Sequence, residues 1–343
     1  MRGMDVCVIG GGPAGLAAAI AARHRGLSVV VMDGHRPPID KPCGEGLMPD
    51  ARREAARLGI EIPMADGFEF RGIRFHGAGR SVEAGFPQGR GIGVRRTALH
   101  EAMINSAVRA GAELRWNSPV SRFEDVQSRW IVGADGASSR VRRWAGLDSC
   151  VRNTRRFAYR QHFAVAPWTD CMEIYWGAGC QIYVTPVGPG EVCVALISRT
   201  PQLRLHEALE RIFPALRARL GEAEATSRER GSVTATMRLR SVARRNVALI
   251  GDASGSVDAI TGEGLCLSFK QAGLLADAMA RGDLAAYDRA HPRLAIRPYL
   301  MSKAMLMLDR GAAIRRASMT AMSWHPRIFQ TMLAVHVSEK LAY

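Results

Sequence analysis

The sequence lacks both a long uninterrupted apolar segment and a cysteine framework. No apolar run reaches the about 18 residues that a membrane-spanning helix needs, so we expect no transmembrane segment. The seven cysteines include no C-x-x-C pair, which argues against zinc and disulfide patterns, and we expect no metal site. An apolar stretch begins at Met4 without separate charged and apolar signal regions before it, which predicts a cytoplasmic protein.

Lysine is scarce as well. The chain has four lysines against 43 arginines, and its formal net charge is +15. The arginines are spread evenly and no basic tract is interleaved with aromatic residues, so we expect no nucleic-acid partner. Most of this charge is expected on a solvated surface, which leaves peripheral contact with an anionic membrane open. The oligomeric state is left open too.

The first 33 residues carry a nucleotide-binding pattern. An apolar strand predicted at 4–9 runs into Gly10-Gly11-Gly12-Pro13-Ala14-Gly15, and a helix over 16–25 follows. A second apolar strand at 28–32 ends at Asp33. This order of strand, glycine turn, helix, strand and acid is the context of a dinucleotide site.

Each residue type in this pattern has a mechanical reason. Gly10 permits the tight turn, Gly12 lets the backbone approach a pyrophosphate, and Gly15 lets the helix pack closely on the strand. The helix N-terminus, at Pro13 and Ala14, offers free N–H groups to the phosphates. Asp33 can accept hydrogen bonds from ribose hydroxyls. The motif alone does not separate FAD from NAD.

The rest of the chain alternates strands with helices. We predict helices at 50–58, 95–109, 203–220 (interrupted by Pro214), 264–281 and through 284–343. We predict strands within 66–94, at 112–116, 119–123 and 130–133, within 155–198, and at 233–239 and 246–252. The Met-rich stretch 300–308 is expected to pack as helix core, with a lipid tunnel as the alternative.

Two later motifs join the fingerprint at predicted strand ends. They are Gly133-Ala134-Asp135-Gly136 and Gly251-Asp252-Ala253. Together the three resemble the para-hydroxybenzoate hydroxylase superfamily of flavoproteins, which implies FAD as cofactor. The resemblance implies that Asp135 lies near the pyrophosphate and that Asp252 reaches the ribityl chain. It also implies that Arg96 helps to hold FAD and that the Val120 backbone meets the adenine.

Two further stretches are similar to the geranylgeranyl reductase group. They are Lys41-Pro42-Cys43-Gly44-Glu45-Gly46 and Thr261-Gly262-Glu263-Gly264, which Leu265 follows. The resemblance implies that both lie against the flavin ring, which makes Lys41, Cys43, Gly44, Gly262, Glu263, Gly264 and Leu265 cofactor-binding candidates beside Gly136 and Gly251. The catalytic candidates are Cys43, Glu45 and Tyr183, and packing of the loop is the alternative for Cys43. Glu45 and Glu263 could be acids near the ring, with loop or helix-start carboxylates as the alternative.

The resemblance implies an α/β fold with a Rossmann-like FAD-binding domain, an interleaved antiparallel-sheet substrate domain and a helical C-terminal tail. The expected FAD-binding domain comprises 1–65, 95–154 and 242–290. The expected substrate domain comprises 66–94 and 155–241, and the tail 291–343.

The expected activity is that of an FAD-dependent oxidoreductase, which reduces a double bond of an isoprenoid or other hydrophobic substrate. A monooxygenase that hydroxylates or epoxidises an aromatic or polyketide-type substrate is the alternative, and a non-enzymatic flavin electron-transfer protein is the second. A second G-x-G-x-x-G is absent, so NAD(P)H is expected as a transient reductant.

Overall fold

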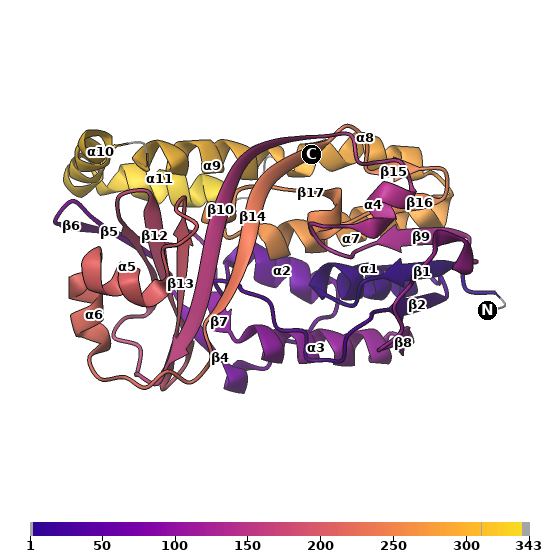
Figure 1. Cartoon of the computed structure of the whole chain (residues 1–343), viewed down its shortest axis with the longest axis horizontal. Helices are drawn as coiled ribbons and strands as arrows, with labels where there is room; N and C mark the ends of the chain where they lie inside the picture. Colours follow the sequence, from indigo (N-terminus) through magenta and orange to yellow (C-terminus); the bar gives the residue numbers. More distant parts are fainter. Residues whose placement is uncertain (1–2, 310, 338–343) are drawn as a thin grey trace.

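The computed structural model describes residues 3–309 and 311–337, which form three sheets and the helices around them (Figure 1). The six-stranded sheet has the order β15 (Ala243–Arg244), β16 (Val247–Leu249), β9 (Trp130–Gly133), β1 (Val6–Ile9), β2 (Val29–Met32) and β8 (Glu113–Arg115). All neighbours are parallel except β15 and β16. The central strands are short apolar runs that are buried throughout, as parallel strands covered on both faces require.

Helix α1 packs against this sheet and against α3 and α7. Its residues 15–22 are Gly, Leu, Ala and Ile, and all are buried. Small side chains let neighbouring helices approach closely, so the Ala-rich sequence suits this central position. The helices are α1 (Pro13–His24), α2 (Pro49–Arg57), α3 (Arg96–Arg109), α4 (Arg140–Trp144), α5 (Leu205–Arg211), α6 (Pro214–Leu220), α7 (Gly264–Arg281), α8 (Leu284–Leu294), α9 (Ile296–Leu308), α10 (Ala312–Trp324) and α11 (Pro326–Val337). No helix among the described residues is long and apolar enough to span a bilayer.

The strand that we predicted at 119–123 is wrong. The chain leaves the sheet after β8, and a 3-10 turn forms at Phe123–Asp125. Pro119 has no N–H to give to a ladder, and the Ser118 N–H is already bonded to the carbonyl of Asp33. The apolar residues Val120 and Phe123 instead pack on the edge of the core.

The large sheet has eight strands. Their order is β17 (Gly255–Ser256), β14 (Arg230–Leu239), β10 (Cys150–Phe163), β13 (Glu191–Ser198), β12 (Cys180–Gly188), β11 (Cys171–Trp176), β5 (Gly72–Gly77) and β6 (Arg80–Gly85). The long strands β10 and β14 run side by side through the middle of the molecule (Figure 1). The sheet is antiparallel except for one parallel pair, β5 with β11, which the sequence did not predict.

Both faces of the large sheet are apolar, and successive residues alternate between them. Ile174, Tyr183 and Ile197 belong to the core that the tail helices cover, whereas Ile182 and Leu196 belong to the core beneath α5 and α6. The sheet is therefore the middle layer between two helical layers.

Residues 66–94 contribute to two sheets. While β5 and β6 belong to the large one, a three-stranded sheet is built from β3 (Gly46–Leu47), β7 (Gly91–Val94) and β4 (Gly67–Phe70). Our domain boundaries stay a prediction.

A buried ionic clamp joins the tail to the large sheet. The guanidinium of Arg156 on β10 contacts Asp258 at 2.9 Å and Asp309 at 3.1 Å, and Arg199 contacts Asp309 at 2.8 Å. Asp258 also accepts the N–H of Ile260. The clamp therefore connects the sheet, the end of α9 and the turn that precedes α7.

We predict that Asp309→Ala lowers the free energy of unfolding by about 3 kcal/mol, because it breaks the buried Arg156–Asp309 ion pair and leaves Asp258 as the one described carboxylate that still pairs with Arg156. The matched control is Asp170→Ala, which removes the exposed partner of Arg71 and should cost less than about 1 kcal/mol. Denaturant unfolding measures both. Equal losses in the two variants would show that the clamp contributes no more than a surface ion pair.

Candidate active site

A cavity of about 800 Å³ brings together most of the site residues that the sequence predicted. They are Gly12, Pro13, Ala14, Lys41, Cys43, Gly44, Glu45, Arg96, Gly136, Tyr183, Gly251, Asp252, Gly262, Glu263, Gly264 and Leu265. Five predicted residues do not line it: Gly10, Gly15, Asp33, Val120 and Asp135. A volume of this size is within the usual range for ligand sites, about 300–1,000 Å³.

The three fingerprint positions require glycine for different reasons. Gly10 has φ +113°, and a Cβ there would lie 2.4 Å from the carbonyl oxygen of Ala134. A Cβ at Gly15 would lie 1.8 Å from the carbonyl oxygen of Gly10. A Cβ at Gly12 would meet no protein atom within 4 Å and would enter the cavity. The protein's own packing thus requires Gly10 and Gly15, and only Gly12 is left open toward a ligand.

The N-terminus of α1 is available to an anion. Gly12 occupies the N-cap position, and no side chain caps the helix. Pro13 has no N–H, and the remaining N–H groups of the first turn carry the positive end of the helix dipole. Pro13 and Ala14 both line the cavity. This arrangement is suited to a phosphate group.

Asp33 and His100 hold the fingerprint turn from two sides. Asp33 accepts the N–H of Gly11 at 2.7 Å and that of His35 at 2.8 Å. His100 accepts the N–H of Ile39 through Nδ1, so its Nε2 carries the proton and donates to the carbonyl of Gly11 at 2.8 Å. Burial lowers the pKa of His100, which agrees with a neutral ring. We missed His100; its only sequence signal is a histidine one turn after Arg96.

Asp135 in the loop after β9 and Arg142 in α4 both bond to the protein's own backbone. Asp135 accepts the N–H groups of Arg140 and Val141 at 2.6 and 3.2 Å, so it caps α4. The buried Arg142 donates to the carbonyls of Ala137 and Ala253, at 2.8 and 3.1 Å. Arg142 therefore ties the second motif to the third, a role that the sequence did not reveal. The predicted position of Asp135 near a pyrophosphate stays a prediction.

Three charged side chains face the cavity near the third motif. Asp252 is open to the cavity, but the cavity walls remove it from bulk water, and this desolvation raises its pKa against the attraction of Lys41 and Arg96. The Nε of Arg96 is buried without a hydrogen-bond partner among the described residues. An anionic ligand rich in hydroxyl groups would satisfy all three.

The Cys43–Glu45 loop is tied to the large sheet. Thr185 on β12 donates to the Gly44 carbonyl at 2.7 Å, and the Cys193 thiol on β13 contacts the Cys43 carbonyl at 3.7 Å. The Cys43 sulfur accepts the N–H of Glu45 at 3.4 Å, while Cys43 and Gly44 both line the cavity. A Cβ at Gly44 would meet no protein atom within 4 Å.

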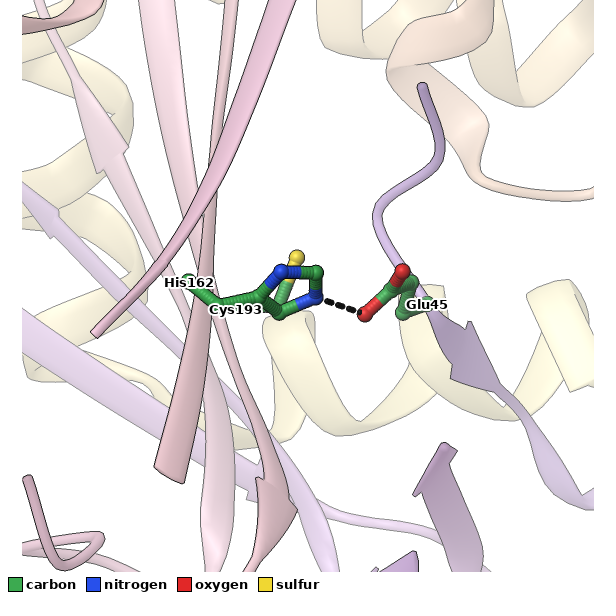
Figure 2. Close-up of side chains that lie close together, drawn as sticks. All are labelled: Glu45, His162 and Cys193. Atoms are coloured by element: carbon green, nitrogen blue, oxygen red, sulfur yellow. Dashed lines mark hydrogen bonds and ion pairs between the residues drawn. The ribbon is translucent and has the colours of Figure 1, made fainter. Parts of the chain in front are cut away.

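Glu45 is buried and already bonded on both carboxylate oxygens. It has φ +58°, accepts the N–H of Arg96 at 3.0 Å and bonds to His162 at 2.6 Å (Figure 2). Its other close neighbours are Cys193 and the Nε of Arg160, at 3.8 Å. Glu45, His162 and Cys193 offer three potential metal ligands within 4.8 Å, but a cation would have to break the Glu45–His162 bond beside the Arg160 charge. A catalytic role for Glu45 stays a prediction.

Tyr183 links the large sheet to the turn before α7. Its hydroxyl donates to the carbonyl of Ile260 at 2.7 Å, and its ring lines the cavity. Burial raises the pKa of this phenol, so it stays protonated. Beyond Ile260, a Cβ at Gly262 or Gly264 would meet no protein atom within 4 Å. The turn therefore presents bare backbone to the cavity.

Glu263 lies in this turn within a buried charged cluster that the sequence did not predict. Its Oε1 is 3.5 Å from Arg297 on α9, and its Oε2 is 3.7 Å from Nδ1 of His336 on α11. Asp50 on α2 and Lys270 on α7 complete the charges of the cluster. Burial raises the pKa of Glu263 to about 8, despite the attraction of Arg297. It also lowers the pKa of His336 to about 4, although Asp50 opposes the shift.

The far half of the cavity is apolar. It is lined by Ile73 and Phe75 from β5, Met172 and Ile174 from β11, Ala195 and Ile197 from β13, Met301 and Met305 from α9, and Phe329 and Leu333 from α11. Met301 and Met305 pack in the core, as we expected of the Met-rich stretch, and they also line the cavity. The lipid tunnel stays a prediction.

The near half fits FAD in its donors and in its shape. Four glycines face this half: Gly12, Gly44, Gly262 and Gly264. A Cβ added at any of them would meet no protein atom within 4 Å. An uncapped helix start, two cations and Asp252 match a diphosphate and a polyol.

Comparisons with known proteins agree with this fit. Residues 5–38 match the family model of an FAD binding domain. Menaquinone reductase of Mycobacterium tuberculosis (strain CDC 1551 / Oshkosh) is 30% identical over 318 residues, which cover 82% of this chain and 78% of the relative. Digeranylgeranylglycerophospholipid reductase of Methanosarcina acetivorans is 27% identical over 324 residues, with coverage of 82% and 77%.

Solved structures share the fold. A geranylgeranyl bacteriochlorophyll reductase-like protein from Thermoplasma acidophilum superposes with a TM-score of 0.75 at 19% identity, covering 97% of this chain and 99% of that one. A flavin-dependent brominase superposes with a TM-score of 0.83 at 18% identity, covering 98% and 96%. The relatives show that the chain belongs to the FAD-dependent oxidoreductases and resembles their geranylgeranyl reductase group, and the solved structures show the same fold.

Proposed function

We propose that this oxidoreductase reduces a carbon–carbon double bond in the isoprenoid chain of a hydrophobic substrate. The observation that carries the proposal is the continuity of one cavity from the fingerprint glycine Gly12 to the apolar wall at Met301 and Phe329. A cofactor and a long apolar chain can meet in such a space. The names of the two relatives support this, since menaquinone and digeranylgeranylglycerophospholipid both contain polyisoprenoid chains.

Different residues of the chain would bind different parts of FAD. The α1 N-terminus and Gly12 would receive the pyrophosphate, with Lys41 and Arg96 as counter-charges. Asp33 would accept a ribose hydroxyl, and Asp252 a ribityl hydroxyl. The bare backbone at Gly262 and Gly264 would lie against the ring. When bound and reduced, FAD supplies the hydride for such a reduction.

The proton for the second carbon needs an acid that keeps its proton at neutral pH. We propose Glu263, because burial raises its pKa to about 8 and its Oε2 has no hydrogen-bond partner among the described residues. Since the ring of His336 is neutral near pH 7, it would orient this carboxylic acid without taking its proton. Tyr183 would fix the turn that carries Glu263, through its bond to Ile260. Cys43 stays a second candidate at the cavity wall.

The experiment that tests the function uses anaerobic enzyme, NADH or NADPH, and either a prenylated quinone or a geranylgeranylated lipid. We expect a product that gains two hydrogens in its isoprenoid chain, which fragmentation in mass spectrometry distinguishes from reduction of a quinone ring to the quinol. Ala195→Phe should fill the apolar half, retain FAD and lose this activity, because Ala195 belongs to the apolar core that lines the cavity with Ile174 and Met301. A product that instead gains an oxygen atom from labelled O2 would contradict the reductase and favour the monooxygenase.

We predict that Gly12→Val abolishes FAD binding without unfolding the protein. The backbone of Gly12 is extended (φ −74°, ψ 179°), which valine adopts readily, and only the space of the cavity is lost. The matched control is Gly190→Val in the β12–β13 turn, where a Cβ also meets no protein atom within 4 Å. Flavin absorbance of the purified variants is the measurement. A soluble Gly12→Val protein with a full complement of FAD would refute the cofactor site.

We predict that Glu263→Gln lowers turnover by about 100-fold or more, as loss of a general acid does. In the unmodified enzyme turnover should fall as the pH rises through about 8, where Glu263 loses its proton. Glu101→Gln, on the exposed side of α3, is the control and should leave the pH profile unchanged.

A second readout does not depend on activity. The raised pKa of folded Glu263 means that its contribution to stability is lost as the pH rises from its usual value of 4.5 toward 8. In this range, between pH 6.5 and 8, unfolded His336 also loses its proton, because its usual pKa is 6.5, but it does so equally in both proteins and cancels in their comparison. Over that window the unfolding free energy of Glu263→Gln should fall less steeply than that of the unmodified protein. Parallel curves would remove Glu263 as the proton donor.

A further inference from the structure

The outer side of the tail helices α9–α11 concentrates exposed apolar side chains. Of the eleven large apolar side chains exposed in residues 3–309 and 311–337, seven lie on these three helices. Ile296, Leu300 and Met307 are spaced by four and seven residues, which places them along one side of α9. The buried residues Met301 and Met305 mark the opposite side.

The next two helices repeat this pattern. Ile314 and Trp324 are exposed on α10, and Trp324 is 72% exposed, more than any other large apolar residue in the described chain. On α11, Ile328 and Val335 are exposed and lie two turns apart, while Phe329 and Leu333 are buried. We call the outer side of these three helices, with its exposed residues, the tail surface.

The charge of the tail surface has one sign. From Ile296 to Val337, the span of α9–α11, the sequence holds six arginines and lysines and a single acid, Asp309. That acid is buried in the clamp with Arg156 and Arg199, so it does not offset the surface. Of these six, Lys303, Arg316 and Arg327 are exposed.

We propose that the tail surface docks on an anionic lipid bilayer. Apolar side chains among cations, without exposed acids, complement a bilayer whose headgroups are negative and whose interior accepts Trp and Ile. A second copy of this chain is disfavoured as occupant, because a symmetric contact would bring two cationic surfaces together. The helices lie together along the upper edge of Figure 1, at the periphery of the molecule.

The inner side of the same helices lines the cavity, so docking would bring the bilayer close to the cavity. Met301 and Met305 on α9, with Phe329 and Leu333 on α11, line the apolar half of the cavity. One helical layer, about 10 Å thick, therefore separates a docked bilayer from the cavity. The docking claim does not depend on which substrate enters.

Sedimentation with vesicles tests the proposal on the FAD-loaded protein. We expect binding to vesicles of phosphatidylcholine and phosphatidylserine at 3:1, and much weaker binding to pure phosphatidylcholine or at high salt. Arg316→Gln with Arg327→Gln should lower the partition coefficient about 25-fold, at about fivefold for each cation removed. The control, Arg122→Gln with Arg245→Gln, removes two exposed cations elsewhere and should bind as the unmodified protein does.

The apolar contribution has its own pair of variants. Leu300→Ser with Trp324→Ser should lower binding at least tenfold, whereas the control Met64→Ser with Val108→Ser should not. Equal losses in the tail and control variants would overturn the proposal. So would a dimer in light scattering that the tail variants convert to monomer while vesicle binding is absent, since the tail surface would then be a subunit interface.

Discussion

The active-site arrangement depends on the Arg156 guanidinium, which binds Asp258 and Asp309 in the protein interior. Asp258 precedes the turn that exposes Gly262 and Gly264 to the cavity, and Asp309 ends α9, whose methionines form the apolar wall. One buried cation on β10 thus sets how the large sheet, the turn and the tail stand relative to one another. The Tyr183–Ile260 hydrogen bond adds a second link between the same sheet and the same turn.

The cavity combines two kinds of surface that come from different layers. Its polar half is mostly backbone, because glycines and an uncapped helix leave N–H groups and space where side chains would otherwise project. Its apolar half is made of side chains from β5, β11, β13, α9 and α11. Glu263 lies in the turn, and its neighbour His336 lies on α11 beside Leu333 of the apolar wall. This position is the basis for our proposal that Glu263 is the proton donor.

Local patterns in the sequence predicted much of the fold and many of the residues that line the cavity. The fingerprint, the two later motifs and the strand–helix order depend on residues that are close together in the chain, so they can be recognised from the sequence alone. The partners of Glu45, Glu263 and the fingerprint turn are not, since His162, His336 and His100 lie far along the chain from the groups they contact. The strand predicted at 119–123 does not form, because Pro119 has no N–H for a ladder and the Ser118 N–H is bonded to the Asp33 carbonyl.

The central claim is that FAD and an isoprenoid chain meet within one cavity between the Thr261–Gly264 turn and the large sheet. A crystal structure of the enzyme with FAD and a saturated isoprenoid product tests it most directly. The account predicts the flavin ring against Gly262, with Cys43 and Tyr183 within contact range of the ring or its adjoining pocket. It also predicts the apolar chain between Met301 and Phe329. A flavin ring outside this cavity, or a product bound elsewhere with the apolar half filled by rearranged side chains, would contradict it.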